Sequence, residues 1–137
     1  MTREILFRGK RMDNGEWTYG YYCPKPYSHF PCEATIFPSE TIDRDWHGER
    51  VDPDTVGQFI GLCDKNGVRI FEGDIVRYGD TIHSVVFEQR NGTAYFGLIY
   101  SPFETLPFGH YQDLKQIEVL GNIHDNPELL EVGENEM

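Results

Sequence analysis

The sequence predicts a mainly β protein, with a long N-terminal β-hairpin lobe, a small C-terminal β-barrel and a short terminal helix. Asn-Gly dipeptides, which favour the tight turns of β-hairpins, occur at Asn14-Gly15, Asn66-Gly67 and Asn91-Gly92. Each lies between runs in which apolar and polar residues alternate, as they do in half-buried strands. A chain of 137 residues can form two small lobes, which we place at residues 1–54 and 55–137.

The first predicted hairpin covers residues 5–23 and has one face of cations and aromatic rings. A two-residue turn at Asn14-Gly15 pairs Met12 with Trp17, Lys10 with Tyr19, and Arg8 with Tyr21. Cationic side chains that lie on aromatic rings add roughly 0.5–1 kcal/mol each at exposed sites. We call these six residues the aromatic-cationic face, and we expect it to be an interface.

The middle hairpin lies within the stretch FIGLCDKNGVRIFEGDIVRYG, residues 59–79. A two-residue turn at Asn66-Gly67 pairs Asp64 with Arg69. In the second strand, Gly73 indicates a bulge or tight bend, and Asp74 is placed to accept hydrogen bonds from nearby backbone amides. Because GD-x-V entering a strand recurs where SH3-like barrels turn a corner, we predict an SH3-like barrel from about residue 55.

The third hairpin, with its turn at Asn91-Gly92, has a register that sorts side chains by polarity. Its nearly apolar face holds the pairs Val85 with Leu98, Phe87 with Phe96, and Gln89 with Ala94. The opposite face is mixed. A face to be buried opposite a half-solvated one is typical of barrel and sandwich hairpins.

The C-terminal part is predicted to hold one more strand, at residues 116–123, and a short helix. Asn126 suits the position before a helix, and Pro127 suits its first turn. Residues 38–55 and 101–113 are predicted to be irregular connections.

Acidic residues dominate the second half of the chain. The net charge is −11, and residues 51–137 hold fifteen Asp or Glu against five Lys or Arg. Such a field repels phosphate backbones, which argues against nucleic acid as a partner, and it favours a basic partner. No apolar run is long enough for a membrane span or a signal peptide, and the cysteine count is odd. We therefore expect a cytoplasmic protein without membrane contact.

No local pattern indicates a catalytic, cofactor or metal site. Cys23 and Cys32 enclose His29, but eight residues between the cysteines exceed the spacing of structural zinc sites. Whether these three residues ever bind a metal is left open. Glycine-rich phosphate loops do not occur in the sequence. We expect no enzymatic activity and no cofactor.

The remaining candidate residues have structural interpretations. Glu72 and Asp74 point to the same side of a strand, as acid–base pairs can, but a bulge and a turn explain them equally well. Cys63 lies in a strand pattern and is expected in the core. His83 falls opposite Tyr100 in the third hairpin, which is an ordinary packing position.

Three blocks of the sequence together resemble the YopX family of bacteriophage and prophage proteins. They are REILFRGKRMDNGEWTYG, DPDTVGQFIGLCDKNGVRIFEGDIV and EVLGNIHDNPELLE, in this order. The resemblance implies a β-rich fold with an SH3-like second part, a phage origin, a bacterial cytoplasm and assembly into homo-oligomers. The family's biochemical activity is not established, so the resemblance implies no catalytic residues.

The sequence thus favours a non-enzymatic phage accessory protein that binds either itself or a host protein. For self-association, we expect the aromatic-cationic face to contact the acidic region of a neighbouring copy. A second hypothesis is a nucleic-acid-binding SH3-like module, because residues 1–11 hold four Lys or Arg and a single Glu. A third is that the acidic surface imitates nucleic acid and occupies the basic groove of a host protein.

Overall fold

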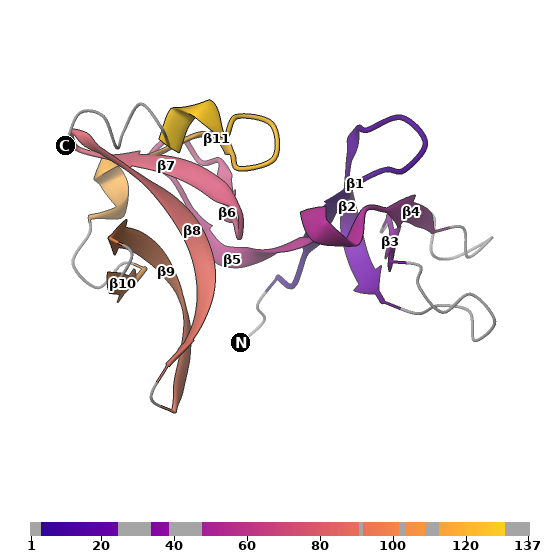
Figure 1. Cartoon of the computed structure of the whole chain (residues 1–137), viewed down its shortest axis with the longest axis horizontal. Coiled ribbons are helices and arrows are strands. Elements are labelled where there is room, and N and C mark those ends of the chain that lie inside the picture. The colour runs from indigo at the N-terminus through magenta and orange to yellow at the C-terminus, as the bar shows by residue number, and fades with distance from the viewer. Residues whose placement is uncertain are drawn as a thin grey trace. The chain divides into compact units, whose positions relative to one another are not determined.

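The computed structural model describes residues 4–24, 34–38, 48–90, 92–101, 104–108 and 113–130. Within these residues the chain forms eleven β-strands, two short 3-10 helices, η1 and η2, and a short helical turn at residues 128–130 (Figure 1). It divides into two compact units, residues 1–59 and 60–137. The boundary falls inside a single strand, β5 (Gly57–Cys63).

The strands of unit 1 belong to a six-stranded sheet with strand order β4-β3-β2-β1-β5-β6, whose last strand is β6 (Arg69–Phe71). Its strands before β5 are β1 (Phe7–Lys10), β2 (Trp17–Cys23), β3 (Ala34–Phe37) and β4 (Glu49–Val51), and η1 covers Pro53–Thr55. Ala34, Ile36 and Val51 form the buried core, against which Phe7 and Tyr22 pack. The strand β4 and the helix η1 replace part of the irregular connection predicted for residues 38–55.

The first hairpin has a longer turn than the sequence predicts. Arg8 pairs with Tyr19 and Lys10 with Trp17, because residues 12–15 form a four-residue loop in which the amide of Gly15 donates to the carbonyl of Arg11 (2.9 Å). The predicted pairs Met12/Trp17, Lys10/Tyr19 and Arg8/Tyr21 are therefore wrong by two residues. A shift of two keeps every strand side chain on its predicted face.

Met12 leaves that face altogether. Its amide donates to the carbonyl of Arg50 in β4 (2.9 Å), and its side chain is 61% exposed in the turn. Arg11 pairs with Val51 in the same place, and its guanidinium bonds the carboxylate of Asp13 at 3.0 and 2.7 Å. Pairing with β4 thus explains why the turn opens to four residues.

Unit 2 contains an antiparallel sheet with strand order β10-β9-β8-β7-β11. Its strands are β7 (Asp74–Tyr78), β8 (Thr81–Arg90), β9 (Thr93–Ser101), β10 (Glu104–Pro107) and β11 (Ile117–Asn122), and η2 covers Leu114–Gln116. The remaining strand of unit 2, β6, is hydrogen-bonded to β5 in the other sheet. Five side chains form the core: Ile70, Val76, Val85, Leu98 and Ile117. The mainly β prediction is confirmed, but β10 and β11 end the sheet within the described residues, so a closed barrel is not seen there.

The third hairpin has the predicted register throughout. Arg90 pairs with Thr93 and Val85 with Leu98, and Gly92 has a φ of +79°, while Asn91 lies outside the described residues. Only one end of the apolar face is buried, however. Phe87, which packs on Phe96, is 45% exposed, because the turn end of β8 and β9 extends beyond the other strands of unit 2 (Figure 1).

Two further predictions need correction, and one is confirmed. The predicted loop at 101–113 contains β10, whose Leu106 pairs with Leu98, and the 3-10 turn at Leu114 follows it. Cys63 is exposed rather than in the core. The short C-terminal helix is present at residues 128–130, where the amide of Leu130 donates to the carbonyl of Pro127 (3.2 Å).

Candidate functional site

The aromatic-cationic face of unit 1 is mainly aromatic where it meets solvent. Tyr19 and Tyr21 alternate on β2 and are 47% and 51% exposed. The sequence predicts that Arg8 contributes a surface charge to this face. In the structure Arg8 is only 6% exposed, so it does not. We call the exposed pair Tyr19 and Tyr21 the tyrosine surface.

The cations of this face contact Trp17 instead. The guanidinium carbon of Arg8 lies 4.7 Å from the Trp17 ring centroid, and the ammonium nitrogen of Lys10 lies 5.6 Å from it. Both distances are within the range of cation–π attraction. These contacts stabilise the hairpin internally and leave the two tyrosines as its outward aromatic groups.

Gly20 allows the strand behind the tyrosine surface to approach closely. It lies between the two tyrosines in sequence and is buried, and a Cβ at this position would overlap the carbonyl oxygen of Phe37. Tyr21 pairs with Phe37 across β2 and β3. The surface is therefore held on a backbone that has little room to move.

The EGD stretch and the middle turn of unit 2 hold the backbone in place. Gly73 has a φ of +93°, and the carboxylate of Asp74 accepts a hydrogen bond from the amide of Phe71 (2.7 Å). In the middle turn, Gly67 has a φ of +80° and follows Asn66, whose backbone amide donates to the side chain of Asp64 (2.8 Å).

The turn of the first hairpin, in unit 1, is built in a similar way. Gly15 has a φ of +72° and follows Asn14, whose side chain accepts from the amide of Glu16 (2.9 Å).

Asp64 is the buried group whose role sequence reasoning missed. Its carboxylate accepts hydrogen bonds from the amides of Asn66, Val68 and Val119, at 2.8, 2.9 and 2.9 Å. Burial, the largest single effect, raises its pKa, but the three amide bonds together outweigh it, so the pKa is lowered. The backbone amide of Asp64 also donates to the carbonyl of Val68. The loop is therefore three residues long, and Asp64 does not pair with Arg69 as the sequence predicts. An Asp immediately before Lys-Asn-Gly is the signal that could have indicated this loop.

The described residues provide no metal site. No group of three or more His, Cys, Asp or Glu among them could hold a metal ion. Cys23 is half-buried, and Cys32 and His29 lie outside the described residues. Buried His83 packs against Tyr100, with ring centroids 4.2 Å apart and an interplanar angle of 39°.

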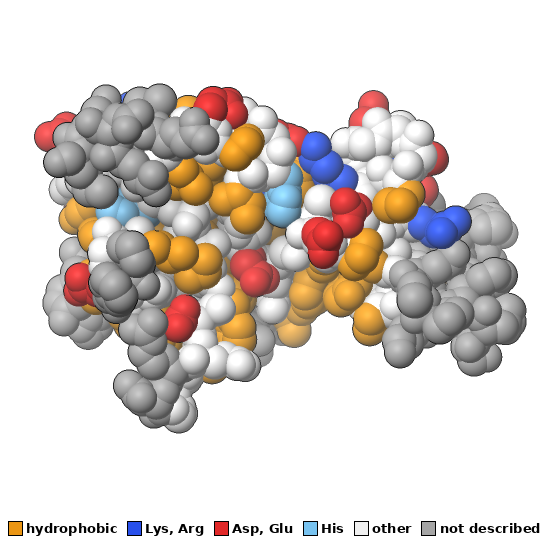
Figure 2. Space-filling view, viewed as in Figure 1, with side chains coloured by type: hydrophobic (Ala, Val, Ile, Leu, Met, Phe, Trp, Pro, Cys, Tyr) orange, Lys and Arg blue, Asp and Glu red, His pale blue; other side chains and the backbone are white. Residues whose placement is uncertain are grey.

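Acidic side chains are spread over the face of the protein shown in Figure 2. Among the coloured residues there, Asp and Glu outnumber Lys and Arg, and hydrophobic side chains lie between them. The charge imbalance of the sequence is thus visible on this face of the surface.

In the part of the chain that is described, no helix has the length and apolar character to cross a membrane.

Comparisons with known proteins place the chain in a family. The sequence matches the family model described as YopX protein over residues 6–131. Among solved structures, the chain is similar to protein EF1440 from Enterococcus faecalis, with 23% sequence identity, a TM-score of 0.49, and coverage of 94% of this chain and 99% of that chain. No match is found among curated proteins. Because the family match spans nearly the whole sequence, the chain belongs to the YopX family.

Proposed function

We propose that this protein is a non-enzymatic accessory protein of bacteriophages and prophages, which acts in the bacterial cytoplasm by binding protein. Its first partner is a second copy of the same chain. The observation that carries the proposal is the tyrosine surface, since Tyr19 and Tyr21 are half exposed on one face of a strand. Tyrosine is enriched at the energetic centres of protein interfaces.

Charge contributes less to this contact than the sequence suggests. Arg8 is buried, so Lys10 is the cation of the first hairpin face that remains partly accessible. The acidic second half of a neighbouring copy can attract it, and added salt screens that attraction. We expect self-association to weaken moderately, rather than disappear, as salt is raised.

Light scattering coupled to size exclusion tests the proposal. The unmodified protein should be oligomeric at micromolar concentration, and the double variant Tyr19→Ser, Tyr21→Ser should be a folded monomer. Val68→Ser is the matched control, because Val68 is 48% exposed but lies in unit 2. A monomeric unmodified protein, or equal dissociation by the control, would contradict the proposal.

Nucleic acid is a second candidate partner. Two half-exposed tyrosines on β2, next to a strand that carries Lys10, resemble the stacking surfaces on which single-stranded bases lie. The net charge of −11 opposes this function. Fluorescence anisotropy with a labelled single-stranded oligonucleotide at low salt decides it: binding that Tyr19→Ser abolishes would support the candidate, and no binding would exclude it.

We also propose that unit 2 is completed as an SH3-like barrel. Two hydrogen bonds support closure, because the amide of Lys65 donates to the carbonyl of Ile117 and the amide of Val119 to the side-chain carboxylate of Asp64, both at 2.9 Å. They join β11 to the turn that follows β5. Slow hydrogen exchange at the amides of Lys65 and Val119 is expected, and fast exchange at both would contradict the closure.

A further inference from the structure

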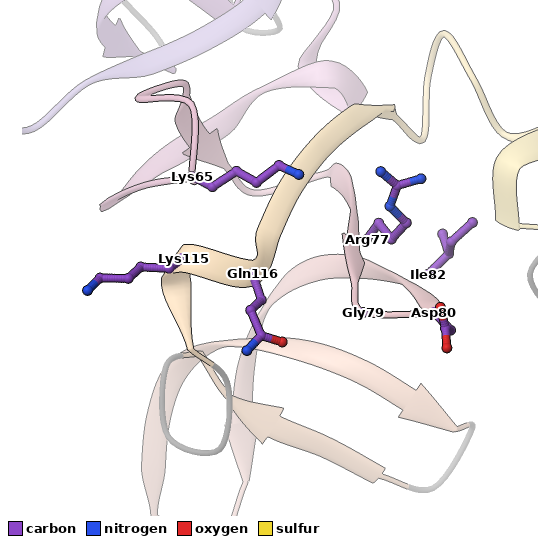
Figure 3. Close-up of a pocket in the computed structure, with 7 residues that line it drawn as sticks. All are labelled: Lys65, Arg77, Gly79, Asp80, Ile82, Lys115 and Gln116. Atoms are coloured by element: carbon purple, nitrogen blue, oxygen red, sulfur yellow. The ribbon is translucent and has the colours of Figure 1, made fainter.

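An open hollow of about 650 Å³ on unit 2 gathers cations in an acidic part of the chain (Figure 3). Lys65, Arg77 and Lys115 line it, and they are three of the only five Lys or Arg in residues 51–137. Asp80 and the amide side chain of Gln116 also line the hollow. The second half has a net charge of −10, so this concentration of positive charge is an exception to its surroundings.

Two of these cations hold a carboxylate. The Oε2 of Glu118 lies 2.9 Å from the ammonium nitrogen of Lys65 and 3.0 Å from Nη2 of Arg77. The hydrogen bond from Lys65 is the main cause that lowers the pKa of Glu118, and the charge of Arg77 lowers it further. The position between Lys65 and Arg77 is thus suited to an anionic oxygen, and the protein's own side chain occupies it.

The backbone fixes this arrangement. Glu118 pairs with Arg77 across β11 and β7, and on the other side of β11 the amide of Lys65 bonds the carbonyl of Ile117. Three neighbouring segments therefore present Lys65, Glu118 and Arg77 in a row. Figure 3 shows Lys65 extending across β11 towards the side of Arg77, while Lys115 extends outwards.

Further donors remain available to a ligand. The side chains of Lys65 and Arg77 are 41% and 47% exposed, and an ammonium and a guanidinium carry more N–H groups than the two contacts with Glu118 use. Lys115 makes no ion pair with any residue that the structure describes, and its flexible chain can turn towards the hollow. The residues that line the hollow include three cations and one carboxylate, Asp80, and Glu118 lies between two of the cations.

We propose that this hollow binds a phosphate group of a small ligand. A long nucleic acid would meet the repulsion of the whole acidic half, whereas charges beyond about 8 Å are largely screened from a small anion at physiological salt. Arg77 can offer two parallel donors to a phosphate, and Lys65 supplies a compact charge beside it. Glu118 competes with the ligand for both cations.

The test is a titration of the isotopically labelled full chain, followed by amide NMR shifts, with inorganic phosphate at constant ionic strength and with chloride as the comparison. Saturable shifts at Lys65, Arg77 and Gln116 are expected. Arg77→Gln should weaken binding roughly tenfold, the equivalent of one charge-assisted hydrogen bond, and Glu118→Gln should strengthen it. The spectra themselves show whether each variant is folded.

Arg69→Gln is the matched control, because Arg69 is an exposed arginine of the same unit outside the hollow. If Arg69→Gln weakens phosphate binding as much as Arg77→Gln does, the effect is one of general charge, and the proposed site is overturned. Absence of saturable shifts in both the unmodified protein and Glu118→Gln would also overturn it. A nucleoside monophosphate should bind at least as well as inorganic phosphate, and tighter binding of an oligonucleotide would reject a small ligand.

Discussion

The carboxylate of Asp64 accepts a hydrogen bond from the amide of Val119, which lies 55 residues further along the chain (2.9 Å). The other carboxylate oxygen accepts from the amides of Asn66 and Val68 in its own turn. One buried side chain therefore closes the middle hairpin and anchors β11 to it. The first prediction concerns this residue.

Asp64→Asn should destabilise unit 2 by about 2–3 kcal/mol, because an amide side chain has one oxygen where the carboxylate has two. Whichever way the new side chain is turned, at least one backbone amide faces an NH₂ group and loses its acceptor. Urea unfolding measures the change. Asp80→Asn, at an exposed turn, is the control and should be nearly neutral.

The same carboxylate should make unit 2 sensitive to acid. Its pKa is lowered in the folded protein, so its contribution to stability is present above the unfolded value of about 3.9 and is lost as the pH falls through the folded value. As the pH is lowered through this range, the free energy of unfolding should decrease more steeply for the unmodified protein than for Asp64→Asn. Parallel curves for the two proteins would contradict this role.

His83 should produce a second pH dependence, at higher pH. Burial lowers its pKa, against the opposing effect of the Ile99 carbonyl, which lies 3.1 Å from Nδ1. The unfolded chain then takes up a proton first, near pH 6.5, so stability should decrease as the pH falls below about 6.5. His83→Gln should remove that decrease and His124→Gln should retain it. A slope that survives in His83→Gln would assign it elsewhere.

Gly20→Ala should disrupt unit 1 far more than Gly15→Ala. A methyl group at Gly20 meets the backbone of Phe37, which cannot rotate away, and overpacking of this kind costs about 1–3 kcal/mol or more. Gly15 has open space around it and only a positive φ, so its substitution costs about 1–2 kcal/mol. Hydrogen exchange in β2 and β3 would compare them, and equal protection in both variants would refute the prediction.

Phe87 and Phe96 should be coupled although they lie near the exposed end of their hairpin. Their ring centroids are 5.2 Å apart at an interplanar angle of 60°, and such pairs contribute about 0.5–1.5 kcal/mol. A double-mutant cycle with Phe87→Ala and Phe96→Ala, followed by thermal unfolding, should give a coupling in this range. Additive effects of the two substitutions would show that the contact contributes nothing.

The hairpins show where sequence reasoning succeeds and where it fails. The register at Asn91-Gly92 was predictable because the apolar pairs Val85/Leu98 and Phe87/Phe96 agree with a two-residue turn. At Asn14-Gly15 the same dipeptide closes a four-residue loop, since the turn also pairs with β4, which is distant in sequence. A local motif cannot reveal a partner strand that follows it by more than thirty residues.

The candidate site was predictable only in part, for a related reason. The alternation along β2 correctly places Tyr19 and Tyr21 on one face with Trp17, and this needs no knowledge of the rest of the fold. The burial of Arg8 depends on packing over that face, which alternation does not report. The hollow at Lys65, Arg77 and Lys115 combines three separate segments, and a net charge summed over residues 51–137 does not reveal such a local group of cations.

The strand β5 has a consequence for how this protein can change over generations. Its first residues pair with β1 in unit 1, and its later part pairs with β6 in unit 2. Genetic exchange that replaced one unit by a relative's would have to join the two parents inside a hydrogen-bonded strand. A single codon gained or lost there would shift the pairing by one residue and turn Ile60 away from the core it packs against. Both units therefore depend on an unchanged length of β5.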